Sequence, residues 1–494
     1  GREYGYLNDD STLERTTKAA VDGNTIISTI DVNIQQIVEK HILAFNEEHK
    51  GEYREGELGS KNTGVIVMNP KTAEVLAMAS YPVYDLNKPT DLSAYYTEQE
   101  IKKMQEEDAF YDTLNQLWKN FCIQDTYEPG STAKSLTIAA ALDSGKITGN
   151  EAYECRGMLT VSGHDIKCHK WSGHGVVDVS GALEQSCNVA LMKIAATVGN
   201  ETFMKYLTSF NMGLRTNIDL AGEGRTDTLI YNVDDMVASD LAISSFGQGY
   251  NVTMIQMATA FCSIINGGYY NEPHVVSEIR NSDGVTVKKN ETRVLKQVIS
   301  NEVSEKMRGY LAAVCTKGTG TTAVPSGYLI GGKTGTAETR PRKQGNYVVS
   351  FIGFAPVDDP QVMVYVVVDR PNVADQPHST FAQELAKEIF TEVLPYMNIF
   401  RTEELSEEQI EELKRLNIIP GGTEDAEEEE GSGEEGDTGE GGSEGAPQEG
   451  EGSPDEEPQY ETDPETGNLI DPQTGQRVDP VTMEYVDPTY SMIE

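Results

Sequence analysis

A serine and a lysine stand three residues apart in the stretch YEPGSTAKSLTIAAALDSG, which begins at Tyr127. Pro129 and Gly130 lead into an apolar run with helical spacing, so Ser131 is predicted at a helix start. The positive end of the helix dipole there favours developing negative charge, and Lys134 follows on the same face. A lysine that loses its proton through desolvation or a nearby cation can deprotonate a hydroxyl. The pattern therefore predicts a serine nucleophile activated by a lysine base.

A second motif supplies groups that could hold a substrate beside this nucleophile. The stretch LIGGKTGTAE reads as a strand, and its Lys-Thr-Gly triplet occurs once in the chain. Lys333 and Thr334 could bind a carboxylate, and Thr336 continues the same strand. Gly335 would let the backbone of a ligand approach closely.

A third motif, S-x-N, is formed by Ser186 and Asn188 at a predicted helix start in ALEQSCNVALMKIAA. The same triplet also begins at Ser60 and at Ser209. The first precedes the nucleophile, and the second comes late in a helical stretch. Ser186 stands 55 residues after Ser131, and its order and context favour it as the third element of the site.

The surrounding sequence predicts one α+β domain. Residues 62–82 and 346–371 each read as strand, turn, strand, which predicts two antiparallel hairpins. The middle of the chain, from about 131 to 265, has mainly helical apolar spacing. Strands early and late with helices between them predict an antiparallel sheet packed between helices and closed by segments that are distant in sequence.

Composition separates this domain from an acidic C-terminal tail. The 494 residues contain 39 Lys and Arg against 80 Asp and Glu, a formal charge of −41, which disfavours nucleic acid as a partner. Counting along 424–458 gives 16 acidic residues and no basic one, which predicts disorder. Residues 401–423 are expected to form a linker helix. Asp-Pro dipeptides recur every eight residues in 459–494, which predicts short extended pieces joined by turns.

Four residues with the spacing C-x12-C-x5-H-x12-C lie near the second catalytic motif. Three thiols and one imidazole are a sound ligand set for tetrahedral zinc. A disulfide between the first two cysteines is an equal alternative in an exported protein. The set consists of Cys155, Cys168, His174 and Cys187, with His164 and His169 as further candidate ligands. The remaining cysteines, at 122, 262 and 315, read as small buried hydrophobic residues.

The ordered motifs S-x-x-K, S-x-N and K-T-G are the signature of penicillin-binding proteins and class A β-lactamases. Residues 24–400 resemble the transpeptidase domain of class B penicillin-binding proteins, the monofunctional enzymes that cross-link peptidoglycan. The resemblance extends to the segments STIDVNIQQIVEKHI, MNPKTAEVLAMASYP and SFGQGYNVTMIQMATAF. It implies the penicillin-binding and serine β-lactamase-like fold. Some relatives carry zinc beside the second motif.

The resemblance also implies a role for each motif residue. Ser131 would be acylated by the penultimate D-Ala of a stem peptide, with Lys134 as its base. Ser186 would relay the proton to the leaving amine, and Asn188 would hold the lysine and the substrate amide. Lys333 would be the cation that lowers the pKa of the base. The terminal carboxylate would be bound by Lys333, Thr334 and Thr336, and the backbone amides of Ser131 and Thr336 would form the oxyanion hole.

Three other functions share these motifs. A serine β-lactamase would need a group that activates water for deacylation, and the sequence shows no such group. A D,D-carboxypeptidase differs only in passing the acyl group to water. A non-catalytic β-lactam sensor or scaffold predicts degraded motifs, whereas all three are intact here.

The resemblance carries expectations about setting and partners. No cofactor is expected for catalysis. Residues 1–23 would join the domain to an upstream pedestal, and an upstream anchor would place the enzyme at the outer face of the bacterial cytoplasmic membrane. Partners would be D-Ala-D-Ala stem peptides, penicillin and other β-lactams, a membrane-embedded glycan polymerase, and proteins of division or elongation.

Overall fold

The computed structural model describes residues 2–7, 13–18, 22–416 and 418, and three two-residue strands near the C-terminus. Side chains are described from residue 22 to 418, except for 412 and 417. The chain divides into two compact units, 1–424 and 425–494. The first unit holds all three motifs and is described first.

The core of the first unit is an antiparallel sheet with five described strands in the order β14-β15-β16-β4-β5. The hairpins predicted for 62–82 and 346–371 are the pairs β4–β5 and β15–β16. Val366 of β16 pairs with Val65 of β4, so the sheet is closed by distant segments as predicted. β14 pairs with β15 alone and forms one edge. The bounds are β4 Ser60–Met68, β5 Val75–Tyr81, β14 Gly331–Glu338, β15 Tyr347–Ala355 and β16 Val362–Pro371.

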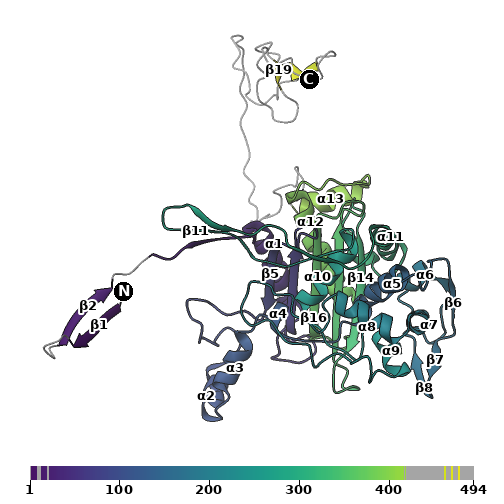
Figure 1. Ribbon diagram of the computed structural model, residues 1–494, viewed down its shortest axis with the longest axis horizontal. Helices are drawn as coiled ribbons and strands as arrows, with labels where there is room; N and C mark the ends of the chain where they lie inside the picture. The colour runs from purple at the N-terminus through teal and green to yellow at the C-terminus, as the bar shows by residue number, and fades with distance from the viewer. Residues whose placement is uncertain are drawn as a thin grey trace, which may run out of the picture. The chain divides into compact units, whose positions relative to one another are not determined.

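Helices cover both faces of this sheet (Figure 1). α1 and α12 pack on one face over an apolar core that contains Val65 and Val366. α4 and α10 pack on the other face over a core that contains Ile66 and Tyr365. Alternate residues of a strand thus enter different cores, which explains the continuous apolar runs of β4 and β16. The bounds are α1 Val32–Glu48, α4 Phe121–Gln124, α10 Met254–Ile265 and α12 Thr380–Tyr396.

The middle of the chain is helical, as predicted, and contains small strands that the sequence analysis did not predict. Residues 152–178 form two antiparallel pairs, β6–β9 and β7–β8, whose strands have four residues each. The bounds are η1 Gly130–Ala133, α5 Lys134–Asp143, β6 Ala152–Cys155, β7 Met158–Val161, β8 His164–Lys167, β9 Gly175–Asp178, α6 Val179–Glu184, α7 Asn188–Val198, α8 Asn200–Ser209 and α9 Ala238–Ser244.

A separate helical segment, α2 Glu98–Glu106 and α3 Phe110–Leu117, has a small apolar cluster of its own around Leu92 and Leu114. α11 Asn301–Lys317 packs beside β14. The other elements of the first unit are β1 Arg2–Leu7, β2 Leu13–Lys18, β3 Thr25–Ser28, β10 Tyr269–Asn271, β11 Val276–Arg280, β12 Thr286–Lys289, β13 Val294–Gln297, η2 Thr321–Ala323 and α13 Glu407–Arg415. Of these, α13 lies within the predicted linker helix.

The second unit is described only at β17 Glu461–Thr462, β18 Leu469–Ile470 and β19 Arg477–Val478. These strands pair antiparallel in that order and begin eight residues apart, each just before an Asp-Pro dipeptide of the repeat. The predicted disordered segment 424–458 lies outside the described residues. Across the described part of the chain, none of the helices is long and apolar enough to cross a bilayer.

Candidate active site

Ser131 lies in a tight turn that packs between the backbone at Gly247 and strand β14. The turn is the 3-10 helix η1, and α5 continues from it at Lys134. Gly130 has φ +58°, and its amide donates to the carbonyl of Gly247 over 2.9 Å. A Cβ at Gly130 would lie 2.7 Å from the carbonyl oxygen of Thr336 in β14. The nucleophile turn and the K-T-G strand therefore touch backbone to backbone, and glycine is required at their contact.

We expect Gly130→Ala to destabilise the domain and to slow acylation of Ser131. The substitution adds the strain of a left-handed residue, about 1–2 kcal/mol, and a clash with a backbone oxygen worth about 1–3 kcal/mol. Gly145→Ala is the matched control, because Gly145 has φ +66° but open space around its Cβ. Thermal unfolding and penicillin acylation rates measure both effects. An equal loss of stability in the two variants would show that the contact with β14 does not matter.

Lys134 is fully buried, and three acceptors hold its ammonium group. Its Nζ donates to the carbonyl of Ser186 (2.6 Å), to Ser186 Oγ (2.9 Å) and to Asn188 Oδ1 (2.7 Å). Ser186 takes φ +53° just before α7, which aims both its carbonyl and its hydroxyl at the lysine. Within residues 22–416 no hydrogen bond joins Ser131 Oγ to Lys134, and such contacts often tighten only when substrate binds.

The K-T-G strand brings a second buried amine to the same hydroxyl. Lys333 Nζ lies 3.1 Å from Ser186 Oγ and 3.2 Å from Thr334 Oγ1. Thr334 Oγ1 is also 3.0 Å from Thr319 Oγ1. A Cβ at Gly335 would lie 2.3 Å from Ser350 Oγ, so the backbone is close-packed there as well. Ser186 thus joins the S-x-x-K and K-T-G motifs, whereas Ser60 of the rejected triplet is buried in β4 against Asn46.

Burial lowers the pKa values of both lysines. Burial lowers the pKa of Lys134 to about 8, and the thiols of Cys168 and Cys187 oppose this shift. The prediction that Lys333 lowers the pKa of Lys134 stays a prediction. Burial, followed by the charge of Lys134, lowers the pKa of Lys333 well below its usual value. Two amines that share one buried hydroxyl release a proton more readily than isolated lysines, and this leaves a neutral amine available as a base.

We expect the rate of acylation by penicillin to rise with pH through an apparent pKa near 8. The neutral form of Lys134 is the competent base, and that form increases as pH rises past its lowered pKa of about 8. Acylation rates from about pH 6 to about pH 10, with melting temperatures measured in parallel to monitor folding, test this. A midpoint at the ordinary lysine value of about 10.4 would contradict it.

The predicted zinc ligands come together beside this site. The ligand atoms of Cys155, Cys168, His174 and Cys187 all lie within 4.8 Å of one another. All three thiols are buried and free. Cys187 is the N-cap of α7, so the cluster adjoins the turn that carries Ser186. His164 lies in β8 outside the cluster, and His169 contacts only its edge, with Nδ1 3.9 Å from Cys168 Sγ.

The spacing inside this cluster suits a tetrahedral ion. Cys168 Sγ and His174 Nδ1 are 3.6 Å apart. Zn–S and Zn–N bonds of about 2.3 and 2.0–2.1 Å at tetrahedral angles put sulfur and nitrogen about 3.5 Å apart. A hydrogen bond between the thiols lowers the pKa of Cys168 and raises that of Cys187. The donor set and this distance therefore fit zinc.

Comparison with known proteins decides the family. The model of the penicillin-binding protein transpeptidase domain matches residues 63–394, which is more than half of the chain. The chain belongs to this family. The resemblance found in the motifs is confirmed, and Ser131, Lys134 and the edge strand β14 lie within the matched region.

The relatives of this penicillin-binding protein support the same assignment. Stage V sporulation protein D of Bacillus subtilis is 33% identical over 76% of this chain and 54% of its own length. Penicillin-binding protein PbpB of Mycolicibacterium smegmatis is 30% identical over 78% of this chain and 56% of its own length. The chain therefore spans about half the length of the curated relatives it matches.

Solved structures confirm the predicted fold. Penicillin-binding protein 3 of Mycobacterium tuberculosis in complex with aztreonam is 26% identical, with a TM-score of 0.66 over 79% of this chain and 83% of that one. The transpeptidase domain of penicillin-binding protein 3 from Burkholderia pseudomallei has a TM-score of 0.61 at 23% identity, over 76% of this chain and 98% of that one. The α+β architecture with an antiparallel sheet between helices is thus shown.

Two residues of this penicillin-binding protein site were missed from the sequence. Thr319 is hydrogen-bonded to Thr334 of the K-T-G motif, and no sequence pattern marked it. Glu128 is 8% exposed and forms ion pairs with Arg340 (3.3 Å) and Arg342 (2.5 Å), which follow β14. Its position three residues before Ser131 was a usable signal, because buried carboxylates require partners.

Proposed function

We propose that this chain is a peptidoglycan D,D-transpeptidase that cross-links stem peptides through an acyl intermediate on Ser131. One observation carries the proposal. The hydroxyl of Ser186 contacts the buried amines of Lys134 and Lys333 at 2.9 and 3.1 Å, at the head of the helix whose first turn presents Ser131. This arrangement supplies a nucleophile, a base and a path for a proton.

The proposed reaction has two acyl transfers. Ser131 Oγ attacks the carbonyl carbon of the penultimate D-Ala, and its proton passes to Lys134. The amide bond to the terminal D-Ala then breaks, and its nitrogen receives a proton through Ser186. An acceptor amine next attacks the acyl ester, which forms the cross-linking amide and returns the proton to Ser131. Asn188 keeps Lys134 in place through the 2.7 Å bond to its Oδ1.

The K-T-G strand would bind and polarise the substrate. Thr334 and Thr336, with the amine of Lys333 as a further donor, would hold the terminal carboxylate. The backbone amides of Ser131 and Thr336 would stabilise the oxyanion, since the two backbones approach closely at Gly130. Penicillin and other β-lactams would acylate the same serine, and aztreonam is bound by the Mycobacterium tuberculosis relative.

Incubation with a D-Ala-D-Ala pentapeptide, with and without an acceptor amine, tests this function. Mass spectrometry should find a penicillin adduct on the peptide that contains Ser131, released D-Ala, and a cross-linked product that requires the amine. D-Ala release with hydrolysis alone would identify a D,D-carboxypeptidase instead. A penicillin adduct without any D-Ala release would identify a β-lactam sensor or scaffold.

We further propose a structural zinc ion held by Cys155, Cys168, His174 and Cys187. The four mutually close donor atoms and the three free buried thiols support it. When bound, such an ion would act as a cross-link and take no part in acyl transfer. It would tie the segment that contains the paired strands β6 and β9 to Cys187, and so would fix the backbone that presents Ser186 and Asn188.

We also propose a setting in wall synthesis for division or cell shape, at the outer face of the bacterial cytoplasmic membrane. The relatives named as peptidoglycan D,D-transpeptidases support the part of this proposal that concerns wall synthesis. An anchor upstream of this chain, a membrane-embedded glycan polymerase and proteins of division or elongation would complete the assembly. Co-purification of the polymerase with the full-length protein would test this.

A further inference from the structure

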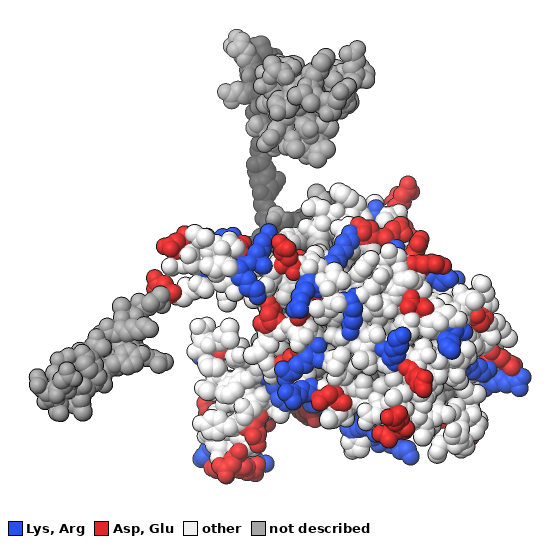
Figure 2. Space-filling model, in the orientation of Figure 1, with Lys and Arg blue, Asp and Glu red and all other residues white. Residues whose placement is uncertain are grey.

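A buried carboxylate three residues before Ser131 takes no part in the chemistry above. The side chain of Glu128 is 7% exposed, the lowest value for an acid in the ion pairs of the described residues. Elsewhere on the first unit, Lys and Arg side chains are mixed with Asp and Glu at the surface (Figure 2), where an ion pair contributes little. A buried carboxylate needs its partners, so the groups that bind Glu128 indicate what it does.

Two other segments of the chain donate hydrogen bonds to Glu128. The amide of Gly249 donates to its Oε1 over 3.2 Å. Arg340 Nε and Arg342 Nη2 donate to its Oε1 and Oε2, over 3.3 and 2.5 Å. Both arginines belong to the turn that joins β14 to β15. Glu128 therefore holds the turn after the K-T-G strand against the segment that leads to the nucleophile.

Arg342 differs from Arg340 because it also binds the end of β14. Its other terminal nitrogen, Nη1, donates to the carbonyl of Glu338, the last residue of that strand. One planar guanidinium thus bridges the carboxylate of Glu128 and a backbone oxygen of the K-T-G strand, which suits its rigid fork of donors. The Arg340 side chain is 68% exposed, and among the described residues its hydrogen bond goes to Glu128 alone.

The bridge through Arg342 is a second point of contact between two backbones that already touch. A Cβ at Gly130 would lie 2.7 Å from the carbonyl oxygen of Thr336, which is two residues before Glu338. A single contact leaves two segments free to rotate about it, whereas two contacts also fix their relative orientation. The bridge therefore fixes the angle between the nucleophile turn and the K-T-G strand as well as their separation.

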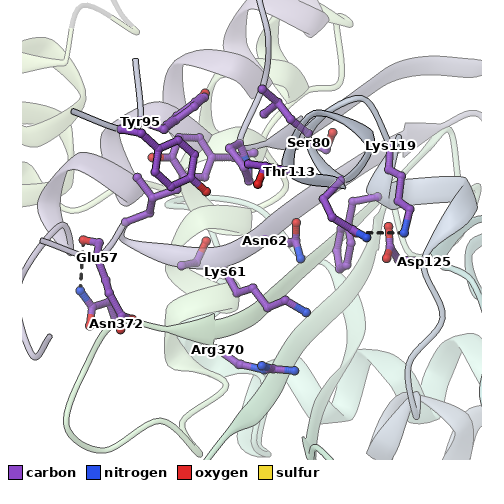
Figure 3. A pocket seen from close by; sticks show the side chains of 18 of the residues that line it. Glu57, Lys61, Asn62, Ser80, Tyr95, Thr113, Lys119, Asp125, Arg370 and Asn372 are labelled. Carbon is purple, nitrogen blue, oxygen red and sulfur yellow. Dashed lines mark hydrogen bonds between the residues drawn. The ribbon is translucent and has the colours of Figure 1, made fainter. Parts of the chain in front are cut away.

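Packing alone does not hold the turn after β14, because a cavity lies beside it. This cavity has a volume of about 220 Å³, and its lining includes Glu128, Glu338 and Arg340. It shares Asp125 with a larger cavity of about 820 Å³, where Figure 3 shows Asp125 among the lining side chains. A turn that borders a cavity instead of close-packed side chains depends on its polar contacts for its position.

We propose that Glu128, acting through Arg342, is a positioning residue for acyl transfer. The inference rests on the proposed transpeptidase function and concerns the two amides that would form the oxyanion hole, those of Ser131 and Thr336. Glu128 lies three positions before the first amide, and Glu338 lies two positions after the second. The bridge between them sets how the two amides face one another. Amides fixed before reaction need no reorganisation in the transition state, and a misplacement of about 1 Å can cost about a hundredfold in rate.

Arg342→Gln tests the proposal, because it removes the bridge while Glu128 keeps its other partners. Acylation rates measured over a range of penicillin concentrations separate the first-order acylation rate constant from the dissociation constant of the complex that precedes it. We expect the rate constant to fall about tenfold or more and the dissociation constant to stay within about twofold. Release of the penicilloyl group should slow as well, since both tetrahedral states use the same amides.

Arg340→Gln is the matched control for this substitution. Arg340 binds the same carboxylate from the same turn but does not bridge to β14, so both rate constants should stay within about twofold. Glu128→Gln should slow acylation as much as Arg342→Gln does. The double variant should be no slower than either single variant, because the two side chains form one bridge.

An acylation rate constant within about twofold of the unsubstituted value in Arg342→Gln would overturn the inference. Faster release of the penicilloyl group would also overturn it, since a site that merely loosens admits water. Melting temperatures show whether each variant is folded, and if Glu128→Gln is not, the comparison of Arg342→Gln with Arg340→Gln decides the question. Failure of the proposed function has a different signature, namely the absence of a penicillin adduct on Ser131 in the unsubstituted chain.

Discussion

Ser131→Ala is expected to abolish covalent labelling by penicillin while the domain stays folded. The hydroxyl is the only group in the proposed mechanism that forms a bond to the acyl carbon, so no partial activity should remain. Removal of one hydroxyl from the first turn of a helix costs at most about 0.5–2 kcal/mol, the value of a cap. Gel fluorescence with a labelled penicillin and thermal unfolding measure the two properties.

Ser135→Ala is the matched control for this substitution. Ser135 lies four residues further along the same helical segment, is buried, and has no hydrogen-bond partner for its hydroxyl among the described residues. Its loss should be near neutral for stability, and labelling should persist. Labelling that survived in Ser131→Ala would move the nucleophile to another residue and end the proposed mechanism.

Removal of the proposed zinc ion is expected to lower thermal stability and acylation rate together. Metal binding free energy is partly folding free energy, and structural zinc contributes about 10–16 kcal/mol in small peptides. In this larger domain we expect a fall of about 5 °C or more in melting temperature. Catalysis should suffer because Cys187 caps the helix that begins at Asn188 and directly follows Ser186. A strong chelator and Cys187→Ser should have the same effect.

A thermodynamic cycle separates zinc from its alternative. The chelator should not weaken Cys187→Ser further, whereas Cys262→Ser, in a different helix, should remain sensitive to chelator. A disulfide between Cys155 and Cys168 predicts sensitivity to reductant and indifference to chelator. Elemental analysis of the reduced protein that found less than about a tenth of an equivalent of zinc would refute the metal site.

The fold was largely predictable because local residue patterns identify its hairpins and its long helices. Runs such as VMVYVVV identify strands that are buried on both faces, and their turns are short. The four-residue strands of 152–178 were missed, since each is half exposed and too short to show a period. The α2–α3 segment also escaped notice, because its small apolar cluster depends on contacts between residues such as Leu92 and Leu114.

The sequence by itself determined the chemistry at this site, because reactive groups are set by residue type and the order of three motifs is specific. It could not determine how those groups act on one another. Lys134 owes its lowered pKa first to burial, and burial depends on packing from the whole domain. Order and context already favoured Ser186 over Ser60 and Ser209, but only the tertiary structure places its hydroxyl between two buried amines. The cavity lined by Lys61, Glu338 and Arg370 likewise exists only because distant strand ends lie side by side.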